Sequence, residues 1–275
     1  MGSGLAELSL LEAIVLGAVQ GLTEFIPISS SGHLVLVPEA LGWSHPSLAF
    51  DVLLHAASLV ALLAYFSGEL LDLGRGVLRG DEEQRRLLGL LALGTVPAAI
   101  AGIALGEYFE SSFEDARSSA IQLVITAVIL VAAELALRHH QQRSAEVGSR
   151  LRGIPDLRVG DASIIGVAQA ISILPGISRS GSTIGAGLAL GMGRDAAARF
   201  AFLLGVPALF GAMLVQLPEL RGSGLGLGAG IAGFVASLVT SYASIWGLLR
   251  YLRTNSLYPF ALYCVIAGVA FFLLV

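Results

Sequence analysis

Gln20 and Glu24 begin the part of the sequence whose residue types can do chemistry, the stretch QGLTEFIPISSSGH at 20–33. They are four residues apart, so a helix places both side chains on one face. An amide oxygen and a carboxylate together suit Mg²⁺ or Ca²⁺, and such an ion would neutralise phosphate oxygens. Two alternatives remain open. Glu24 could form a structural ion pair with Arg179, and Gln20 could satisfy backbone groups.

Ser30 and His33 follow in the same stretch, after a break that contains proline. A serine close to a histidine is a plausible nucleophile and base. His33 titrates near neutral pH, so it could relay a proton or protonate a leaving phosphate. As alternatives, Ser30 could only hold a phosphate oxygen, and His33 could cap the helix that follows.

A second polar break, PGISRSGST at 175–183, contains Arg179. Its guanidinium can hold a phosphate through two parallel hydrogen bonds, with helix capping as the alternative role. Hydroxyl groups surround both breaks. We expect them to hydrogen-bond phosphate oxygens, although they could instead cap helices; they are Ser29, Ser31, Ser178, Ser180 and Thr183.

The composition is that of an integral membrane protein. The chain has 275 residues, of which 55% are hydrophobic and 13% charged, and its mean hydropathy is +0.81. A soluble domain has about 25% charged residues. The net charge of −4, without a basic stripe, argues against a nucleic-acid partner. A carboxylate within a membrane is costly, so Glu24 is by default a functional candidate.

The apolar segments divide the chain into spans and interrupted stretches. Each span needs roughly 20 residues to cross a hydrocarbon core of ~30 Å. Two further stretches, 5–41 and 161–191, are apolar but are cut near the middle by Pro, Gly and hydroxyl residues. The six predicted spans are 48–66, 87–106, 118–138, 199–217, 226–249 and 257–275.

The arginines are concentrated in alternate loops. The positive-inside rule places 67–86 and 139–160 in the cytoplasm, and 107–117, 218–225 and both termini outside. This alternation requires each interrupted stretch to enter and leave on the same face. We therefore predict two re-entrant helical hairpins.

The two halves of the chain resemble each other. GAVQGLTEFIPISSSG (17–32) is similar to GVAQAISILPGISRSG (166–181), and FDVLLHAASLVALL (50–63) to FAFLLGVPALFGAM (200–213). One hairpin and an odd number of spans per half give an inverted-topology repeat. We predict one all-α polytopic membrane domain over 1–275, with repeats at about 5–138 and 161–275. The hairpin tips would meet near the midplane, where two helix N-termini suit an anion.

QGLTEFIPISSSGH and PGISRSGST resemble the two signature motifs of the BacA/UppP family, the undecaprenyl-diphosphatases. The resemblance extends over nearly the whole chain. It implies a hydrolase of the bacterial inner (plasma) membrane that removes the terminal phosphate of undecaprenyl diphosphate. This reaction recycles the lipid carrier for cell-wall synthesis and is linked to bacitracin resistance. Gln20 stands where many members carry Glu, which removes one possible metal carboxylate.

The resemblance also implies roles for individual residues. Glu24, Ser30, His33 and Arg179 would be catalytic, and Gln20 and Glu24 would bind Mg²⁺ or Ca²⁺. The polyisoprenyl diphosphate would be attacked at the outer face of the membrane, among membrane lipids. A homo-oligomer is compatible with this assignment.

Other interpretations remain open at this point. Transporters are also built from inverted repeats with broken helices, so a lipid or anion transporter or a lipid flippase is the main alternative. A membrane scaffold would leave the polar cluster unexplained. Asp51 and His55 could support the site or anchor an interface, and Glu134 is expected to pair with Arg138. The sequence leaves the isoprenoid length, the metal and the choice of Ser30 or water as nucleophile undecided.

Overall fold

The structure is a computed structural model that describes residues 8–104, 116–174, 176–220 and 225–274. Within these ranges the chain is helical, apart from turns and an isolated β-bridge between Arg152 and Met192. Two short 3-10 helices, η1 (Ile154–Asp156) and η2 (Leu217–Leu220), accompany the α-helices. The α-helices are α1 (Leu10–Phe25), α2 (Ser30–Leu41), α3 (Leu48–Tyr65), α4 (Ser67–Arg79), α5 (Glu82–Ala104), α7 (Ala116–Glu146), α8 (Val159–Ile171), α9 (Arg179–Ala189), α10 (Arg194–Gln216), α11 (Leu227–Leu252) and α12 (Tyr258–Leu274).

Five described helices, α3, α5, α7, α10 and α11, are long and apolar enough to cross a membrane. They correspond to the first five predicted spans, although α7 continues to Glu146, beyond the predicted end at 138. The sixth predicted span is α12, a shorter apolar helix of 17 residues, and position 275 lies outside the described residues. The all-helical, polytopic class is therefore confirmed, whereas the number of six spans stays a prediction.

The loops are less uniform than the sequence suggested. The predicted cytoplasmic loop at 67–86 contains the amphipathic helix α4, of which only Leu73 is buried. The predicted outer loop at 107–117 lies mostly outside the described residues, and half of the one at 218–225 does. Which loops face the cytoplasm therefore stays a prediction.

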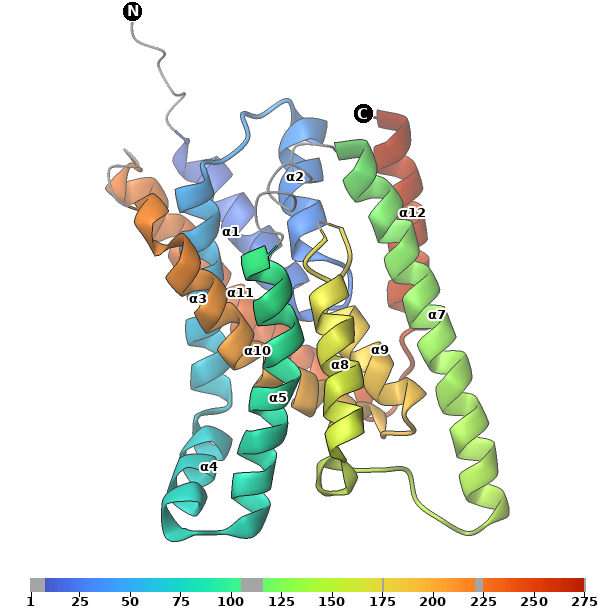
Figure 1. The fold of residues 1–275 in the computed structure, drawn as a ribbon. Helices are drawn as coiled ribbons and strands as arrows, with labels where there is room; N and C mark the ends of the chain where they lie inside the picture. Colours follow the sequence, from blue (N-terminus) through green and yellow to red (C-terminus); the bar gives the residue numbers. More distant parts are fainter. Residues whose placement is uncertain (1–7, 105–115, 175, 221–224, 275) are drawn as a thin grey trace, which may run out of the picture.

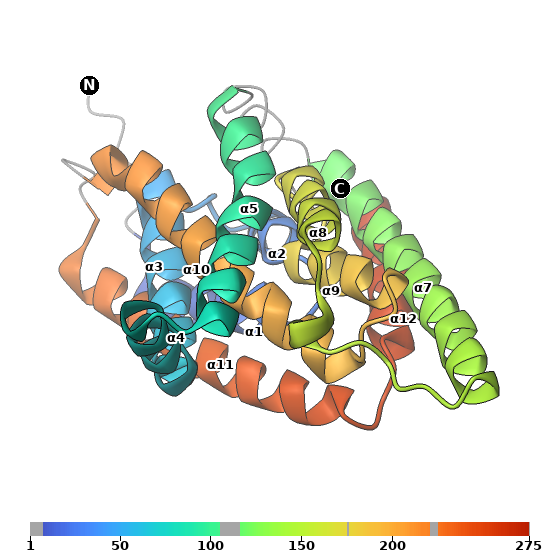
Figure 2. The ribbon, with the colours of Figure 1, turned by 60° about the horizontal axis from the view of Figure 1, so that its bottom comes forward.

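Two helical hairpins occupy the middle of the molecule (Figure 1). In this view α1 and α2 enter from the upper end, α8 and α9 enter from the lower end, and the two turns lie side by side near the middle. In Figure 2, α3 and α10 lie together on one side of the hairpins, and α7 and α12 on the other. The hairpins are therefore flanked on two sides by other helices of the bundle.

The two hairpin turns are built alike. Ser29 precedes α2, and its hydroxyl accepts a hydrogen bond from the backbone N–H of Gly32 at 3.4 Å. Ser178 precedes α9, and its hydroxyl accepts one from Gly181 at 3.1 Å. Both contacts are N-caps, which satisfy one of the free N–H groups at a helix start. The two turns thus share a helix cap as well as a sequence pattern, although the backbone of Ser29 (φ +70°) differs from that of Ser178 (φ −70°).

Glycine contacts connect each hairpin to the other half of the chain. A side chain at Gly17 in α1 would collide with the backbone of Gly233 in α11. Likewise, a side chain at Gly166 in α8 would collide with Gly94 in α5. Gly17 and Gly166 occupy equivalent positions in the repeated segments. Small residues allow such close approach between helix backbones in membranes, so the two halves pack on each other through matched contacts.

Candidate functional site

The Glu24 carboxylate, in the last turn of α1, is the centre of a buried polar cluster. Only 6% of the residue is exposed. Its Oε1 accepts a hydrogen bond from Arg179 Nη2 at 2.9 Å, and its Oε2 accepts one from Ser30 Oγ at 2.5 Å. Gln20 Nε2 also donates to Oε2, at 3.1 Å. The fold thus brings together four of the predicted site residues.

Ser30 and Arg179 reach Glu24 from equivalent places in the two hairpins. Each is the first residue of its helix, α2 or α9, and each follows a capping serine. The first turn of a helix has free N–H groups and the positive end of the helix dipole. The buried carboxylate is therefore stabilised by a guanidinium and by two nearby helix N-termini, which also suit a phosphate group.

Aromatic side chains close the end of α1. Phe25 packs edge-to-face on Phe202, with ring centroids 5.4 Å apart, and Phe202 packs on Phe66 at 6.2 Å. All three rings are fully buried. Such an apolar wall keeps water away and strengthens the electrostatic interactions of the neighbouring Glu24.

Arg179 has room beside α10 because Gly205 carries no side chain. A Cβ at Gly205 would collide with the guanidinium. This guanidinium has five N–H donors, and its bond to Glu24 uses one of them. The ion pair that the sequence offered as an alternative role is therefore present, and it remains compatible with a grip on phosphate.

His33 does not face Ser30. Its Nδ1 donates to the carbonyl of Ser29 at 2.7 Å, and its Nε2 accepts from the hydroxyl of Tyr263 at 2.7 Å, on which the ring also stacks. The residue is 3% exposed. Ser29 has a φ of +70°, an uncommon conformation for a non-glycine residue. Because both ring nitrogens are engaged, His33 holds this turn in place, and the expected Ser30–His33 pair is not formed.

His55 is a member of the cluster that the sequence left undecided. It lies on α3, and its Nε2 is 3.8 Å from Glu24 Oε2. Its Nδ1 donates to the backbone carbonyl of Asp51 at 2.9 Å, which turns Nε2 towards the carboxylate. The side chain is 34% exposed, so it lies at the edge of the buried cluster. The four-residue spacing of Asp51 and His55 was a signal, but it could not indicate Glu24 as the neighbour.

The hydroxyl groups around the two turns mostly bind the protein itself. Thr183 donates to the carbonyl of Arg179 within its own helix, at 2.8 Å. Ser180 donates to the carbonyl of Ile26 at 3.3 Å. Ser31 accepts from the backbone N–H of Gly176 at 3.3 Å and so connects the two turns. Ser29 and Ser178 are helix caps. In this structure these groups therefore cap helices, bond within α9 or connect the two hairpins.

The donor set for a divalent cation is small. Among the described residues there is no group of three or more His, Cys, Asp or Glu side chains that could hold a metal ion. However, the Oε1 atom of Gln20 is buried and has no hydrogen-bond partner in the described part of the chain. Mg²⁺ often binds through one or two carboxylates together with substrate phosphates. The Glu24 carboxylate and the Gln20 amide oxygen fit an ion of this kind only if the substrate supplies further oxygens.

Glu134 forms a separate buried ion pair, with a different partner from the one expected. Its carboxylate accepts from Arg194 Nε at 2.9 Å and Nη2 at 2.5 Å, and from the backbone N–H of Leu257 at 2.8 Å. Arg138 instead lies over the ring of Tyr258, 4.8 Å from its centroid. The predicted Glu134–Arg138 pair is therefore wrong. Glu134 does not pair with Arg138, one helical turn away in α7. It binds Arg194 of α10 and the backbone at the start of α12 instead, and so joins three helices.

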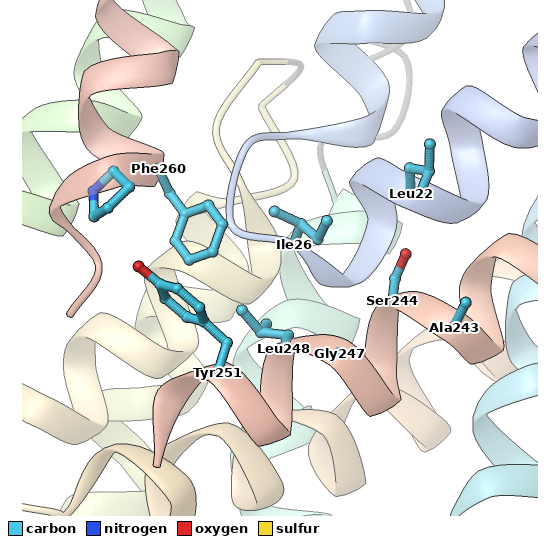
Figure 3. Close-up of a pocket in the computed structure, with 9 residues that line it drawn as sticks. Leu22, Ile26, Ala243, Ser244, Gly247, Leu248, Tyr251 and Phe260 are labelled. Carbon is cyan, nitrogen blue, oxygen red and sulfur yellow. The ribbon is translucent and has the colours of Figure 1, made fainter. Parts of the chain in front are cut away.

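An apolar groove lies on the other side of α1 (Figure 3). Leu22 and Ile26 line it, and each is two residues from Glu24, which places them on the opposite helix face. The groove has a volume of about 380 Å³ and is completed by side chains of α11 and α12. It contains none of the acidic or basic groups of the Glu24 cluster, so the polar chemistry and this groove are separate features.

The apolar helices and the polar site together define the class of protein. The site consists of a buried carboxylate with a serine and an arginine, at the point where two hairpins meet. This is an integral, multi-pass membrane protein with a polar site inside its helical bundle. The sequence matches the family described as bacitracin resistance protein BacA over residues 13–270. The chain therefore belongs to the BacA family.

Curated relatives match over almost the entire chain. An undecaprenyl-diphosphatase of Gloeobacter violaceus is 42% identical over 265 residues, which are 94% of this chain and 89% of the relative. One of Syntrophotalea carbinolica is 42% identical over 270 residues, 96% of this chain and 98% of the relative. One of Nostoc sp. is 38% identical over 283 residues, 98% of this chain and 85% of the relative.

Proposed function

We propose that this protein hydrolyses undecaprenyl diphosphate to undecaprenyl phosphate and inorganic phosphate, recycling the lipid carrier for cell-wall synthesis. The observation that carries the proposal is the contact of Glu24 with Ser30 and Arg179 between two helix N-termini. Phosphoryl transfer needs a nucleophile, a proton acceptor and positive charge near the phosphate. The cluster contains all three, and the relatives are named for this activity.

Ser30 is the proposed nucleophile, and Glu24 is its proton acceptor. The Ser30 hydroxyl donates to Glu24 Oε2 at 2.5 Å, so its proton can pass to the carboxylate as Oγ attacks the terminal phosphorus. The bond from phosphorus to the bridging oxygen then breaks, and undecaprenyl phosphate leaves. Water finally hydrolyses the phosphoserine and releases inorganic phosphate. This assignment gives Glu24 the role that the sequence suggested for His33.

Arg179 and the helix N-termini provide the positive charge. During transfer, negative charge is spread over the oxygens of the phosphoryl group. Guanidinium and backbone N–H donors that are already in place stabilise such charge without reorganisation. Arg179 is well suited to this role because Glu24 binds only one of its N–H groups and so holds the guanidinium in place. The other N–H groups can then bind phosphate oxygens.

A divalent cation, Mg²⁺ or Ca²⁺, is part of the proposal. Glu24 and Gln20, whose Oε1 has no partner among the described residues, would hold it together with diphosphate oxygens. When bound, the ion supplies additional positive charge to the diphosphate. The other residues of the cluster keep the roles described above.

The proposed setting is six spans and two re-entrant hairpins in an inverted repeat, within the bacterial inner membrane. The equivalent serine caps and the matched glycine contacts of the two halves support the repeat. The arginine-rich loops at 67–86 and 139–160 would face the cytoplasm. The α1–α2 hairpin would then enter from the outer face, where the lipid diphosphate is taken up.

Phosphate release from undecaprenyl diphosphate by the purified protein in detergent tests the proposal. Release is expected with Mg²⁺ or Ca²⁺ present, and it should stop with EDTA and return when the cation is restored. Movement of the lipid between the leaflets of proteoliposomes, without phosphate release under any of these conditions, would support a transporter instead.

A further inference from the structure

Two polar side chains of the α8–α9 hairpin are buried without a hydrogen-bond partner in the described part of the chain. Gln169 in α8 is 2% exposed, and neither its Nε2 nor its Oε1 atom has a hydrogen-bond partner within the described ranges. Ser182 in α9 is 5% exposed, and its Oγ also has no partner there. Buried polar groups are nearly always hydrogen-bonded, because leaving one unpaired is costly. Two such groups in one hairpin therefore require an explanation.

The sequence similarity of the two hairpins explains why the Gln169 side chain has no partner among the residues that the structure describes. Its counterpart in the first hairpin is Gln20, which donates to Glu24 four residues further along the chain. The residue four after Gln169 is Ile173, which offers no acceptor. The second hairpin has thus kept a buried amide and has no carboxylate to pair with it. An amide with no structural partner is available to a ligand.

The helix positions place Ser182 beside Arg179 of the Glu24 cluster, and Gln169 at about the same depth in the neighbouring helix. Ser182 is three residues after Arg179, and side chains at this spacing are neighbours on one helix face. Arg179 itself contacts Glu24. Gln169 is two residues before the end of α8, and Ser182 is three residues after the start of α9. In an antiparallel hairpin these positions lie at about the same depth, since each residue advances a helix by 1.5 Å.

We infer that Gln169 and Ser182 form a subsite for the second phosphoryl group of the diphosphate, the one that stays on the lipid. Ser30, Glu24 and Arg179 act on the terminal group, which leaves the other phosphoryl oxygens without assigned donors. The Ser182 hydroxyl and the Gln169 amide N–H can donate to these oxygens, and the Gln169 carbonyl can accept from a water molecule. This inference rests on the proposed function and deepens it.

The neighbouring hydroxyl groups are already engaged in hydrogen bonds of the protein and are not available to the phosphoryl group in the same way. Thr183 donates to the carbonyl of Arg179, and Ser180 to that of Ile26. Ser178 caps α9 through Gly181. These groups already stabilise the turn, whereas Ser182 and Gln169 stabilise nothing that is visible in the described residues. The subsite therefore consists of the two polar groups that the fold itself does not use.

Gln169→Met and Ser182→Ala test the subsite in the purified full-length protein, with undecaprenyl diphosphate as substrate. Each change removes a buried polar group that lacks a structural partner, so the melting temperature should stay the same or rise. KM should rise about tenfold, the effect of losing roughly one hydrogen bond to a charged group. The change in kcat should be less than about threefold, because these groups hold the phosphoryl group that is not transferred.

Product inhibition separates this subsite from the transfer site. Inhibition by undecaprenyl phosphate should weaken in both variants by the same factor as KM, while inhibition by inorganic phosphate should not change. Gln122→Met is the control, since Gln122 is a half-buried amide whose Oε1 atom is buried and has no partner in the described chain, while its Nε2 donates to Ser118 at 3.0 Å. Its KM should equal that of the wild type.

Three results would overturn the inference. One is an unchanged KM in both variants, which would make the two groups structural. Another is an equal rise in KM for Gln122→Met, and the third is a fall in kcat at constant KM. If Gln169→Met does not fold, the KM of Ser182→Ala alone decides whether the subsite exists, because this variant removes only a single hydroxyl from the other helix. A wild-type protein that releases no phosphate would contradict the proposed function itself, so the two failures are distinguishable.

Discussion

The two hairpin turns cap their helices alike, although the capping serine has a φ of +70° at Ser29 and −70° at Ser178, and they carry opposite charges. Ser29 and Ser178 cap their helices in the same way, and the next residue is Ser30 in one turn and Arg179 in the other. Both reach the same carboxylate, Glu24. The first turn therefore provides the acid and the hydroxyl, and the second provides the cation. Two hairpins with similar caps thus form one asymmetric site instead of two similar ones.

This difference depends on single positions. Glu24 has Ile173 as its counterpart in the second hairpin, and Ser30 has Arg179. A carboxylate in both hairpins would place two negative charges close together at low dielectric, which is unfavourable. One carboxylate and one guanidinium instead compensate each other and still attract an anion to the helix N-termini. The comparison predicts that the two turns respond differently to equivalent substitutions.

The largest effect is expected for Glu24, because it is the single acidic member of the cluster. Glu24→Ala should lower kcat by about 10³-fold or more, since loss of a proton acceptor typically costs 10²–10⁴-fold. Glu24→Gln should be nearly as inactive because it lacks the charge. Substrate turnover and the melting temperature should be measured together, as the unpaired Arg179 also destabilises the fold. Wild-type turnover of Glu24→Ala in EDTA would exclude both the base and the metal role.

The cationic turn should show a smaller but still large effect. Arg179→Lys keeps the charge and loses the planar group that can hold Glu24 and a phosphate at the same time. We expect kcat to fall about 10²-fold, similar to the loss of one preorganised donor to a transition-state charge. KM should rise as well. A kcat close to that of the wild type would reduce Arg179 to a structural ion pair.

A modest effect is expected where the first turn is held in place. Tyr263→Phe removes the hydroxyl that donates to His33 Nε2. It should lower the free energy of unfolding by ~1 kcal/mol, the typical contribution of one hydrogen bond, and change kcat by less than about threefold. Chemical denaturation and steady-state kinetics of the same preparation measure both. A hundredfold loss of kcat with unchanged stability would instead return His33 to a role in proton transfer.

The orientation of the hairpins can be tested without affecting catalysis. A cysteine at Ser144, in a Cys264→Ser background, should react with a membrane-impermeant reagent only from the cytoplasmic side. Ser144 lies near the end of α7, in the arginine-rich segment assigned to the cytoplasm. Labelling of intact cells from outside would reverse the topology and place the α8–α9 hairpin at the outer face.

The sequence was sufficient for the features that depend on local pattern. Apolar segments of about 20 residues identified α3, α5, α7, α10 and α11, and the Pro–Gly–Ser breaks identified both hairpin turns. The pairing of Glu24 with Arg179 could be anticipated because a buried charge in a membrane needs a partner. Local periodicity and the cost of buried charge therefore account for the architecture and the centre of the site.

Partners that lie far apart in sequence could not be predicted. His33 binds Tyr263, and Glu134 binds Arg194. The sequence favoured nearby residues, Ser30 and Arg138, because spacing along a helix is the visible signal. Tertiary packing instead selects partners from helices that become neighbours only in the folded chain. The same limit applies to Gln169, because only the surrounding helices show that its side chain lacks a partner within the described ranges.

A quenched single turnover tests most directly whether Ser30, with Glu24 as its base, attacks the lipid diphosphate. The wild-type protein is mixed with substrate labelled in the terminal phosphate, stopped in acid at successive times and separated from lipid. Labelled protein should appear before labelled phosphate is released, and the label should map to Ser30. Ser30→Ala should give no labelled protein and almost no turnover. If the wild type never carries the label while Ser30→Ala retains a few per cent of the wild-type rate, water is the nucleophile and Ser30 only holds a phosphate oxygen.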